Sequence, residues 1–478
     1  MNEISSIEKE ASAAVTKLPD PARRLAEFAA SLRIEDVPER VRLRAVHHIL
    51  DAVGIACVSA KQDFALRTLT AIKGLAGRGE APVIGLPARL PPRDAALVNG
   101  VLCHGLDFDD THLGGIVHSS ASAFPAALSA SIMAGASGRS MLLAYIIGME
   151  VTARVGAVGR GAFHDHGFHP TGVAGVFGAA LVAGRLLGLT AGEMTAAQGI
   201  ALSMASGSLE FLEDGAWNKR MHPGWAAQAG ITAAALAKQG FVGASAPYAG
   251  RFGLYNLYTA GGLARRDLSL ATAGLGDIWE LERTAIKPYP ACHFTHACVD
   301  AALLLREAGL RPEQVERIEA LMPEQVIPVV CEPEANKQRP ANTYDAQFSV
   351  PFLVSAALVR GRLTLAELDA LNDPDILELA RRVGYAADPN SPFPRTYSGE
   401  LVVHTTDGRT LRQREEINRG ATERPLSNAD IVAKYEGNAA LAFSPETMAR
   451  VQEAVLGLES APSATVFAAV LSPAGAAA

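Results

Sequence analysis

The segment HGLDFDDTH at residues 104–112, followed by a histidine at position 118, concentrates acids, imidazoles and a hydroxyl in a chain poor in charge. On a helix, His104, Asp107 and Thr111 fall at positions i, i+3 and i+7 and share one face. Such a face is costly to bury unless its groups have partners, and the surrounding sequence is apolar. The segment predicts a wall of an active site for proton transfer and anion handling, with a capped, solvated helix end as the alternative.

Two histidines, His118 and His169, stand next to predicted helix starts. His118 precedes a serine-rich helix start whose backbone N–H groups are suited to hold a carboxylate. His169 ends the segment FHDHGFH and precedes a Gly/Ala-rich helix, a position that favours a general acid or base. The spacing of His164, His166 and His169 matches no zinc motif, so we expect no metal ion at the site.

Two basic segments supply candidate partners for an anionic substrate. WNKRMHPG at residues 217–224 offers Lys219, Arg220 and His222, which fit either a pocket for a substrate carboxylate or a solvated surface loop. KPYPACHFTH at residues 287–296 contains two prolines that fix an extended, rigid segment. That segment presents Lys287 and His293 at a predicted domain junction, where ligand clefts are common; a plain linker is the alternative. The polar segment at 342–349 is interpreted as a helix cap.

Composition and missing motifs exclude several classes of protein. The chain has a net charge of −7 and no basic stripe, so we expect no nucleic-acid partner. It contains no phosphate-binding GxxxxGK[ST], no GxGxxG after a strand and no GxSxG nucleophile elbow. Five cysteines without a CxxC pair predict a reducing, cytoplasmic location without disulfides. The first residues lack the apolar core of a signal peptide, and the most apolar run, 173–184, is shorter than the about 20 residues that span a bilayer, so we expect no membrane partner.

The elements that must position these side chains are mostly helical. At 478 residues the chain is long enough for two domains. Helical periodicity runs through 39–59, 93–106, 121–134, 139–158, 173–187 and 225–239. Thr190 and Glu193 form a capping-box pattern that predicts a helix start, and the many small residues favour close helix–helix approach.

The character of the sequence changes near Leu281. Residues 317–322, 399–405 and 409–413 predict strands, the last two joined by the turn Thr406-Asp-Gly408. Helical patterns at 296–308, 348–359 and 365–371 lie between them, and helical periodicity returns at 444–456. We therefore predict a mostly α fold with an α+β part: a large all-helical domain of residues 1–280 and 425–478, and a smaller inserted α+β lid domain of residues 281–424. Residues 472–478 are expected to fray.

Five motifs in order resemble the MmgE/PrpD family over roughly residues 20–460. They are HGLDFDDTH with its distal His118, GFHPTGVAGVFGAA, WNKRMHPG, KPYPACHFTH and NRGATERPLS. The family includes 2-methylcitrate dehydratase, cis-aconitate decarboxylase and iminodisuccinate epimerase. The resemblance implies a homodimer with a helical domain and an α+β lid, working without a metal or organic cofactor on a small carboxylate substrate.

The same resemblance implies a set of site residues, which we expect to converge on one cleft. The decarboxylase positions fall on Asp107, Thr111, His118, His169, Lys219 and Lys287. A lid histidine of the decarboxylase falls on Cys292 here, and its lid tyrosine has no match near 322–330, so both departures weaken cis-aconitate decarboxylation. The 2-methylcitrate dehydratase motif has asparagine in place of Asp109 and tryptophan in place of His112. The HGLDFDDTH…VHS form therefore resembles more closely the epimerase and unassigned bacterial members of the family.

These residues imply carbanion chemistry next to a carboxylate. Lys219 and Lys287 would neutralise developing charge, and His118 or His169 would move the proton. Asp107 would orient an imidazole or a lysine, and Thr111 would donate a hydrogen bond to substrate. Arg220, His222, Cys292 and His293 are predicted to bind substrate, while Asp109, Asp110 and His112 are predicted to be structural. The predicted function is a cofactor-free lyase, a dehydratase or decarboxylase of a small di- or tricarboxylic acid; the alternatives are an epimerase of an iminodisuccinate-type acid and a non-catalytic dicarboxylate-binding dimer.

Overall fold

The computed structural model describes residues 20–472, and their contacts divide the chain into two compact units. The first unit holds residues 20–105, 109–284 and 428–472, and the second holds 106–108 and 285–427. The change of unit comes at 284/285 and 427/428, a few residues after the predicted 280/281 and 424/425. Three residues of the opening motif, 106–108, belong to the second unit, which the sequence did not predict. Most of the predicted frayed end lies outside the described residues.

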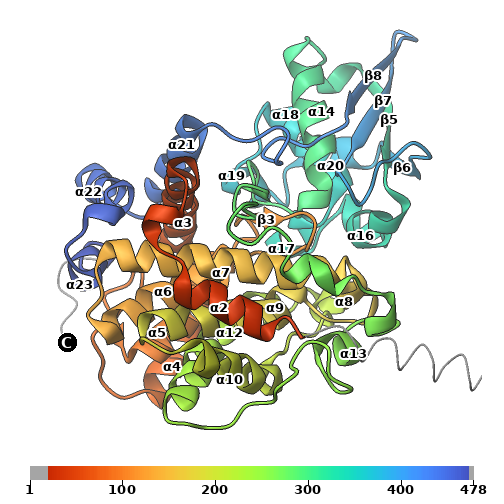
Figure 1. The fold of residues 1–478 in the computed structure, drawn as a ribbon. Helices are drawn as coiled ribbons and strands as arrows, with labels where there is room; N and C mark the ends of the chain where they lie inside the picture. The colour runs from red at the N-terminus through yellow and green to blue at the C-terminus, as the bar shows by residue number, and fades with distance from the viewer. Residues whose placement is uncertain (1–19, 473–478) are drawn as a thin grey trace, which may run out of the picture. The chain divides into compact units, whose positions relative to one another are not determined.

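The first unit is built of helices (Figure 1). They are α2 (Ala22–Ser31), α3 (Glu39–Ser59), α4 (Asp63–Leu75), α5 (Pro92–His104), α6 (Ser120–Ala134), α7 (Gly138–Gly159), α8 (Ala162–Asp165), α9 (Pro170–Leu186), α10 (Ala191–Ala201), α11 (Phe211–Asp214), α12 (Asn218–Lys238), α13 (Leu254–Tyr258), α21 (Asn428–Ala439), α22 (Pro445–Leu456) and α23 (Ala464–Ala468). Short strands β1 (Ala81–Pro82), β2 (Arg89–Leu90) and β3 (Thr111–His112) join them. A further short strand, β4 (Thr284–Ala285), spans the end of this unit and the start of the second.

Small residues let the central helices of this unit approach closely, as the sequence predicted. Helix α12 packs against α5 and α9, and α9 packs against α7. A Cβ atom on Gly100 of α5 would lie 2.4 Å from the Cα of Gly224 in α12, and one on Gly224 would lie 2.2 Å from the carbonyl oxygen of Leu97. No side chain fits at this crossing, so it holds the C-terminal part of α5 against the N-terminal part of α12.

Helix α10 begins at the predicted capping box. The Thr190 hydroxyl accepts the backbone N–H of Glu193 at 3.2 Å, and the Glu193 carboxylate accepts the backbone N–H of Thr190 at 2.7 Å. Both contacts satisfy N–H groups that a helix start otherwise leaves open. The prediction of a helix start at Thr190 is confirmed.

Helix α7 is long and apolar enough to cross a bilayer by length and composition alone. Of its most apolar stretch, 94% is buried inside the structure, and it packs against α6 and α9. Core helices of soluble proteins share these properties, so α7 is weak evidence for a membrane span.

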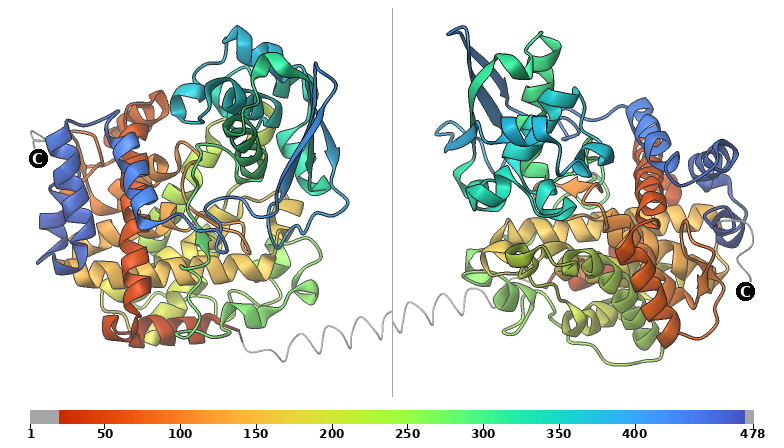
Figure 2. Two further views of the ribbon diagram at one scale, coloured as in Figure 1. Left: turned by 90° about the horizontal axis from the view of Figure 1, so that it is seen from above. Right: turned by 180° about the vertical axis from the view of Figure 1, so that it is seen from behind.

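The second unit combines a mixed sheet with helices (Figures 1 and 2). The strand order is β6 (Val383–Ala387), β5 (Val315–Met322), β7 (Gly399–Thr405) and β8 (Thr410–Glu415), with β5 parallel to β6 and the other pairs antiparallel. The helices are α14 (His296–Glu307), α15 (Ile327–Val330), α16 (Glu334–Gln338), α17 (Thr343–Gln347), α18 (Val350–Arg360), α19 (Leu365–Leu368) and α20 (Pro374–Ala380). Helix α14 packs against β7, β8 and α18.

The predicted fold class, mostly α with an α+β part, is confirmed. The β7–β8 hairpin turns at the predicted Thr406–Gly408, where Gly408 takes a positive φ of 83° that suits a residue without a side chain. Strand β6, with the sequence VGYAA, was not predicted, because it lacks alternation of apolar and polar residues. Its place in the sheet depends on pairing with β5.

Candidate active site

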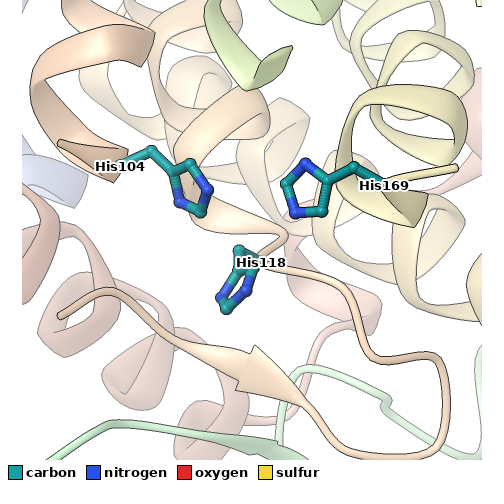
Figure 3. A group of neighbouring side chains, drawn as sticks. All are labelled: His104, His118 and His169. Atoms are coloured by element: carbon teal, nitrogen blue, oxygen red, sulfur yellow. The ribbon is translucent and has the colours of Figure 1, made fainter. Parts of the chain in front are cut away.

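Four histidines of the first unit come together from the ends of four helices. His104 ends α5, His118 lies two residues before α6, His169 is the N-cap of α9, and His222 lies in the first turns of α12. All four are buried. The ring centroid of His104 lies 4.9 Å from that of His118 and 5.6 Å from that of His169, and the His169 and His222 centroids are 5.2 Å apart. Figure 3 shows the rings of His104, His118 and His169 gathered together, each from a different segment. We call His104, His118, His169 and His222 the histidine cluster.

The chain leaves the helix directly after His104. Gly105 caps α5, and Asp107 adopts a positive φ of 50°, a conformation that aspartate tolerates better than most residues. Thr111 already lies in β3. The prediction that His104, Asp107 and Thr111 share one helix face is therefore wrong: Asp107 and Thr111 do not continue α5, and Asp107 belongs to the second unit.

A carboxylate orients His104. The Nδ1 atom of His104 lies 2.7 Å from Oδ2 of Asp109, and both side chains are buried. A carboxylate accepts a hydrogen bond and does not donate one, so Nδ1 of a neutral His104 carries the proton and Nε2 carries the lone pair. Asp109, which was predicted to be structural, therefore orients the imidazole of His104.

The imidazole of His118 is held in a similar way. Its Nδ1 atom lies 2.7 Å from the backbone carbonyl oxygen of Asp110 and 3.3 Å from the hydroxyl of Thr111. Its backbone N–H donates to the hydroxyl of Thr171 in α9 at 3.1 Å. The carbonyl acceptor places the proton on Nδ1, so Nε2 of the neutral ring is the basic atom.

The loop in front of His118 has a strained residue. Ile116 is β-branched, yet its φ is +51°, a region that such residues avoid. Strain of this kind persists only where the surrounding contacts enforce it, and it is enriched at functional sites.

His169 and His222 share a hydrogen bond between imidazoles. Their Nδ1 atoms lie 3.0 Å apart, so one ring donates and the other accepts. Burial, together with the neighbouring histidines and Lys219, lowers the pKa of His169 well below its ordinary value. Burial, with His104 and Lys219, lowers the pKa of His222 to about 4. Both rings are therefore neutral near pH 7.

Two further side chains of the opening motif, Asp110 and His112, hold the loop in place. Burial disfavours the charged form of Asp110, but hydrogen bonds from His48 and Ser120 hold its pKa below the ordinary value. His112 contacts the Glu280 carboxylate through Nε2 at 3.0 Å and accepts the backbone N–H of Gly115 through Nδ1 at 3.1 Å. These contacts agree with the structural roles predicted for Asp110 and His112.

Two cations stand at the start of α12, and their surroundings differ. Lys219 is buried close enough to His169 and His222 to lower the pKa of both rings. Arg220 donates from Nε to the carbonyl oxygen of Gly105 at 2.8 Å, and its guanidinium lies 4.7 Å from the ring centroid of Phe64. Arg220 thus satisfies a carbonyl at the end of α5. Its predicted contact with substrate stays a prediction.

The second unit contains a buried ion pair. The Nζ atom of Lys287 donates to the Asp107 carboxylate at 2.7 Å and to the Asp107 carbonyl oxygen at 2.8 Å. Lys287 is 1% exposed and Asp107 is 3% exposed. A buried lysine keeps its charge only with such a partner, so the pair fixes a positive charge at this position.

The other two predicted site residues of the second unit, Cys292 and His293, are neighbours in the sequence and follow Lys287 by a few residues. The ring of His293 lies 4.6 Å from that of His296 and 5.7 Å from that of Tyr397, and its Nε2 atom contacts the side-chain amide of Asn418. The backbone N–H of the buried Cys292 donates to the carbonyl oxygen of Gln347 at 2.8 Å.

The polar segment 342–349 caps helices as predicted, through Asn342 at α17 and Ser349 at α18.

Family models match both parts of the chain. The MmgE/PrpD N-terminal domain matches residues 23–266, and the MmgE/PrpD C-terminal domain matches residues 289–460. The chain belongs to the MmgE/PrpD family.

Curated relatives of this MmgE/PrpD chain include several proteins named cis-aconitate decarboxylase. The protein from Aspergillus terreus is 27% identical over 459 residues, which are 91% of this chain and 92% of the relative. The protein from Mus musculus is 28% identical, covering 92% of this chain and 91% of its own length. The protein from Homo sapiens is 29% identical, covering 92% of both.

Within this MmgE/PrpD chain the predicted site residues form two groups. Thr111, His118, His169 and His222 lie together in the first unit with Lys219 and Arg220 nearby, and Asp107, Lys287, Cys292 and His293 lie in the second. Their convergence on one cleft stays a prediction. No catalytic role was predicted for His104 or Asp109, and Asn418 was not predicted as a site residue, although all three stand in the motifs that resemble the family.

Proposed function

We propose that the protein is a lyase that dehydrates or decarboxylates a small di- or tricarboxylic acid without a cofactor. The observation that carries this proposal is the histidine cluster, in which imidazoles with fixed hydrogen-bond partners gather out of water. Neutral imidazoles in fixed tautomers are suited to take and give protons near pH 7. The names of the curated relatives, cis-aconitate decarboxylases, support the same reaction class.

The chemistry requires a base and a counter-charge. A proton next to a carboxylate is weakly acidic, because removing it builds a second negative charge beside the first. A buried cation lowers that cost by several kcal/mol, and Lys219 and Lys287 are the cations we assign to this role. A positioned imidazole contributes about 10²–10⁴-fold in rate, and we assign this step to His118, whose Nε2 is the basic atom.

The ends of three helices favour an anionic substrate. The N-termini of α6, α9 and α12, beside His118, His169 and His222, belong to helices of 15, 17 and 21 residues. Each helix N-terminus carries a partial positive charge and open N–H groups, which suit a carboxylate. His169 is then the second proton carrier, and Asp107 keeps Lys287 charged and in place.

Epimerisation of an iminodisuccinate-type acid is the second candidate. It needs two bases, which His118 and His169 would supply, and it is supported by the HGLDFDDTH…VHS form of the opening motif, which resembles the epimerase. In a dehydratase or decarboxylase, one of the same histidines would instead protonate the leaving hydroxyl or the carbanion formed by loss of CO2.

Turnover in D2O separates these possibilities. The EDTA-treated enzyme is incubated with a panel of small di- and tricarboxylic acids, and products are followed by NMR. A lyase releases water or CO2 from one acid, and His169→Gln lowers that rate by about 10²-fold or more while the exposed control His166→Gln leaves it unchanged.

Two other results would replace the lyase proposal. Deuterium uptake with inversion, and no loss of water or CO2, would establish the epimerase. Binding of an acid without turnover would instead indicate a non-catalytic dicarboxylate-binding protein. We further propose that the protein is a cytoplasmic homodimer. The sedimentation coefficient of the purified chain tests whether it is a dimer.

A further inference from the structure

A short segment between α10 and α12 packs against the paired imidazoles of the histidine cluster. The backbone N–H of His169 donates to the carbonyl oxygen of Gly207 at 2.8 Å, and that of Leu209 donates to the carbonyl oxygen of Gly167 at 3.0 Å. These two bonds hold the segment against the residues that lead into α9. We call residues 206–215 the covering segment.

Two glycines allow this close approach. A Cβ atom on Gly207 would lie 3.2 Å from Nδ1 of His222, and Gly207 has a φ of +137°, which side chains other than hydrogen rarely permit. A Cβ atom on Gly172, in the first turn of α9, would lie 2.4 Å from the carbonyl oxygen of Ser206. A side chain at Gly207 would press on the His222 ring, so the backbone of the covering segment closes this side of the pair.

Phe211, the first residue of α11, closes another side. It is 3% exposed, and its ring centroid lies 6.2 Å from that of His169 and 6.0 Å from that of His222. The next residue, Leu212, is 42% exposed. The acids of the covering segment are also exposed: Glu210, Glu213 and Asp214. The aromatic side chain of a mostly polar stretch thus turns inward, onto two imidazoles.

The hydrogen bond between these imidazoles depends on the absence of water. The Nδ1 atoms of His169 and His222 lie 3.0 Å apart, so one carries a proton and the other a lone pair. Protonation of the accepting ring would place two N–H donors opposite each other and break the bond. Water would supply other acceptors for those donors, whereas a phenyl ring forms no comparable hydrogen bond. An apolar cover therefore favours the paired, neutral state.

The groups that face the pair from other elements act in the same direction. They are Lys219 of α12, His104 at the end of α5 and His118 before α6, and each disfavours a positive charge on His169. Burial is nevertheless the largest cause of the low pKa values of His169 and His222. Phe211 contributes to that burial from the covering segment.

We propose that Phe211 is a positioning residue of the candidate active site: its ring keeps water from His169 and His222 and so preserves the hydrogen bond between their Nδ1 atoms. The effect of Phe211 on turnover rests on the proposed function, in which His169 carries a proton. The shielding of the two rings does not rest on it.

Titration of the histidines by NMR tests the shielding without turnover. The full-length chain carries histidine isotopically labelled at Cε1, and the signals of the pair are assigned with His169→Gln and His222→Gln. In the wild type we expect His222 to stay neutral down to about pH 5, since its pKa is about 4. In Phe211→Ala water replaces the phenyl ring, so the pKa of His222 should rise by about one pH unit and that of His169 in the same direction.

Two further variants separate shielding from a general loss of packing. Phe211→Leu keeps an apolar cover and should keep the pKa of His222 close to that of the wild type. Leu212→Ala removes an exposed apolar side chain from the same short helix and should change nothing. Where an acid is turned over, the decline of kcat/KM on the acid side should begin at a higher pH in Phe211→Ala than in the wild type or Phe211→Leu.

Several outcomes would overturn the role of Phe211. One is a wild-type His222 that titrates near the ordinary value of about 6.5, because the pair would then be open to water, and this holds even if Phe211→Ala does not fold. Another is an unchanged pKa of His222 in Phe211→Ala that circular dichroism shows to be folded. A lower pKa there would mean that the ring stabilises the imidazolium through its π face, which is the opposite role.

The role of Phe211 and the lyase function fail separately. A shifted pKa in Phe211→Ala, in a chain that turns over no acid, would refute the lyase alone. Turnover of an acid by a chain in which Phe211→Ala leaves the pKa of His222 unchanged would refute the role of Phe211 alone.

Discussion

The histidine cluster and the Asp107–Lys287 pair solve the problem of burying polar groups in opposite ways. The cluster keeps His169 and His222 neutral, because burial lowers their pKa values and they hydrogen-bond to each other. The pair keeps both partners charged, since Lys287 donates twice to Asp107 in a buried place. Neutral rings are able to gain and lose protons, whereas a matched ion pair resists both. We infer that the first unit moves protons and the second supplies fixed charge.

The largest expected effect is on turnover. His118→Gln removes the basic nitrogen while keeping a polar side chain near the Asp110 carbonyl oxygen. If His118 is the proton carrier, kcat falls by about 10²–10⁴-fold, and the melting temperature changes little. The measurement is the steady-state rate with the acid found in the D2O panel. A loss smaller than fivefold would move the proton-transfer role to His104 or His169.

The next effect is on stability, and it tests the fixed charge. Lys287→Met leaves the Asp107 carboxylate buried without its cation, which should lower the free energy of unfolding by about 3–5 kcal/mol. Adding Asp107→Asn to the same variant should recover a large part of that loss, because no buried charge is then left alone. Urea unfolding of the two variants and of Lys73→Met, an exposed lysine of α4, gives the comparison. Equal loss in the single and double variants would contradict the ion-pair interpretation.

Lowering the pH should reduce the contribution of the histidine cluster to the stability of the fold. Because the folded-state pKa of His222 is about 4 and that of an unfolded histidine is about 6.5, the unfolded chain binds more protons between these values. The contribution of His222 to stability is full above pH 6.5 and is lost as the pH falls toward 4, by up to about 3 kcal/mol. His169 shifts in the same direction.

His222→Gln isolates this contribution. The decrease in unfolding free energy between pH 7.5 and pH 5 should be smaller in His222→Gln than in the wild type, and unchanged in His166→Gln. Urea unfolding at the two pH values measures it. Identical slopes in all three proteins would mean that His222 is not neutral in the folded chain.

Periodicity and caps predicted much of the fold. Helix α3 (Glu39–Ser59) and strand β7 (Gly399–Thr405) have the predicted bounds, and the Thr190 cap was predicted from two residues. These features depend on contacts between residues near in sequence. Strand β6 was missed because its conformation comes from its partner β5, a long-range contact that a single sequence does not reveal.

The candidate site was predicted by residue type but not by geometry. The helix-face interpretation of the opening motif failed at Asp107, where the chain turns into the second unit and tertiary contacts outweigh helical spacing. The same turn brings Asp109 back to His104, so a pair five residues apart became a hydrogen-bonded dyad. Sequence spacing treats these residues as points on a regular helix and therefore could not reveal the contact.

Thr111 gives the smallest effect and the sharpest distinction between binding and positioning. The sequence predicted that its hydroxyl contacts substrate, whereas the structure places it 3.3 Å from Nδ1 of His118, which already has the Asp110 carbonyl oxygen at 2.7 Å. Thr111→Val keeps the shape and removes the hydroxyl, at a cost of about 1 kcal/mol, or about fivefold. If Thr111 positions His118, the change is in kcat and its pH profile, and KM stays the same. A rise in KM at constant kcat would instead indicate that the Thr111 hydroxyl binds the substrate. The tautomer of His118 would then depend on the Asp110 carbonyl oxygen alone.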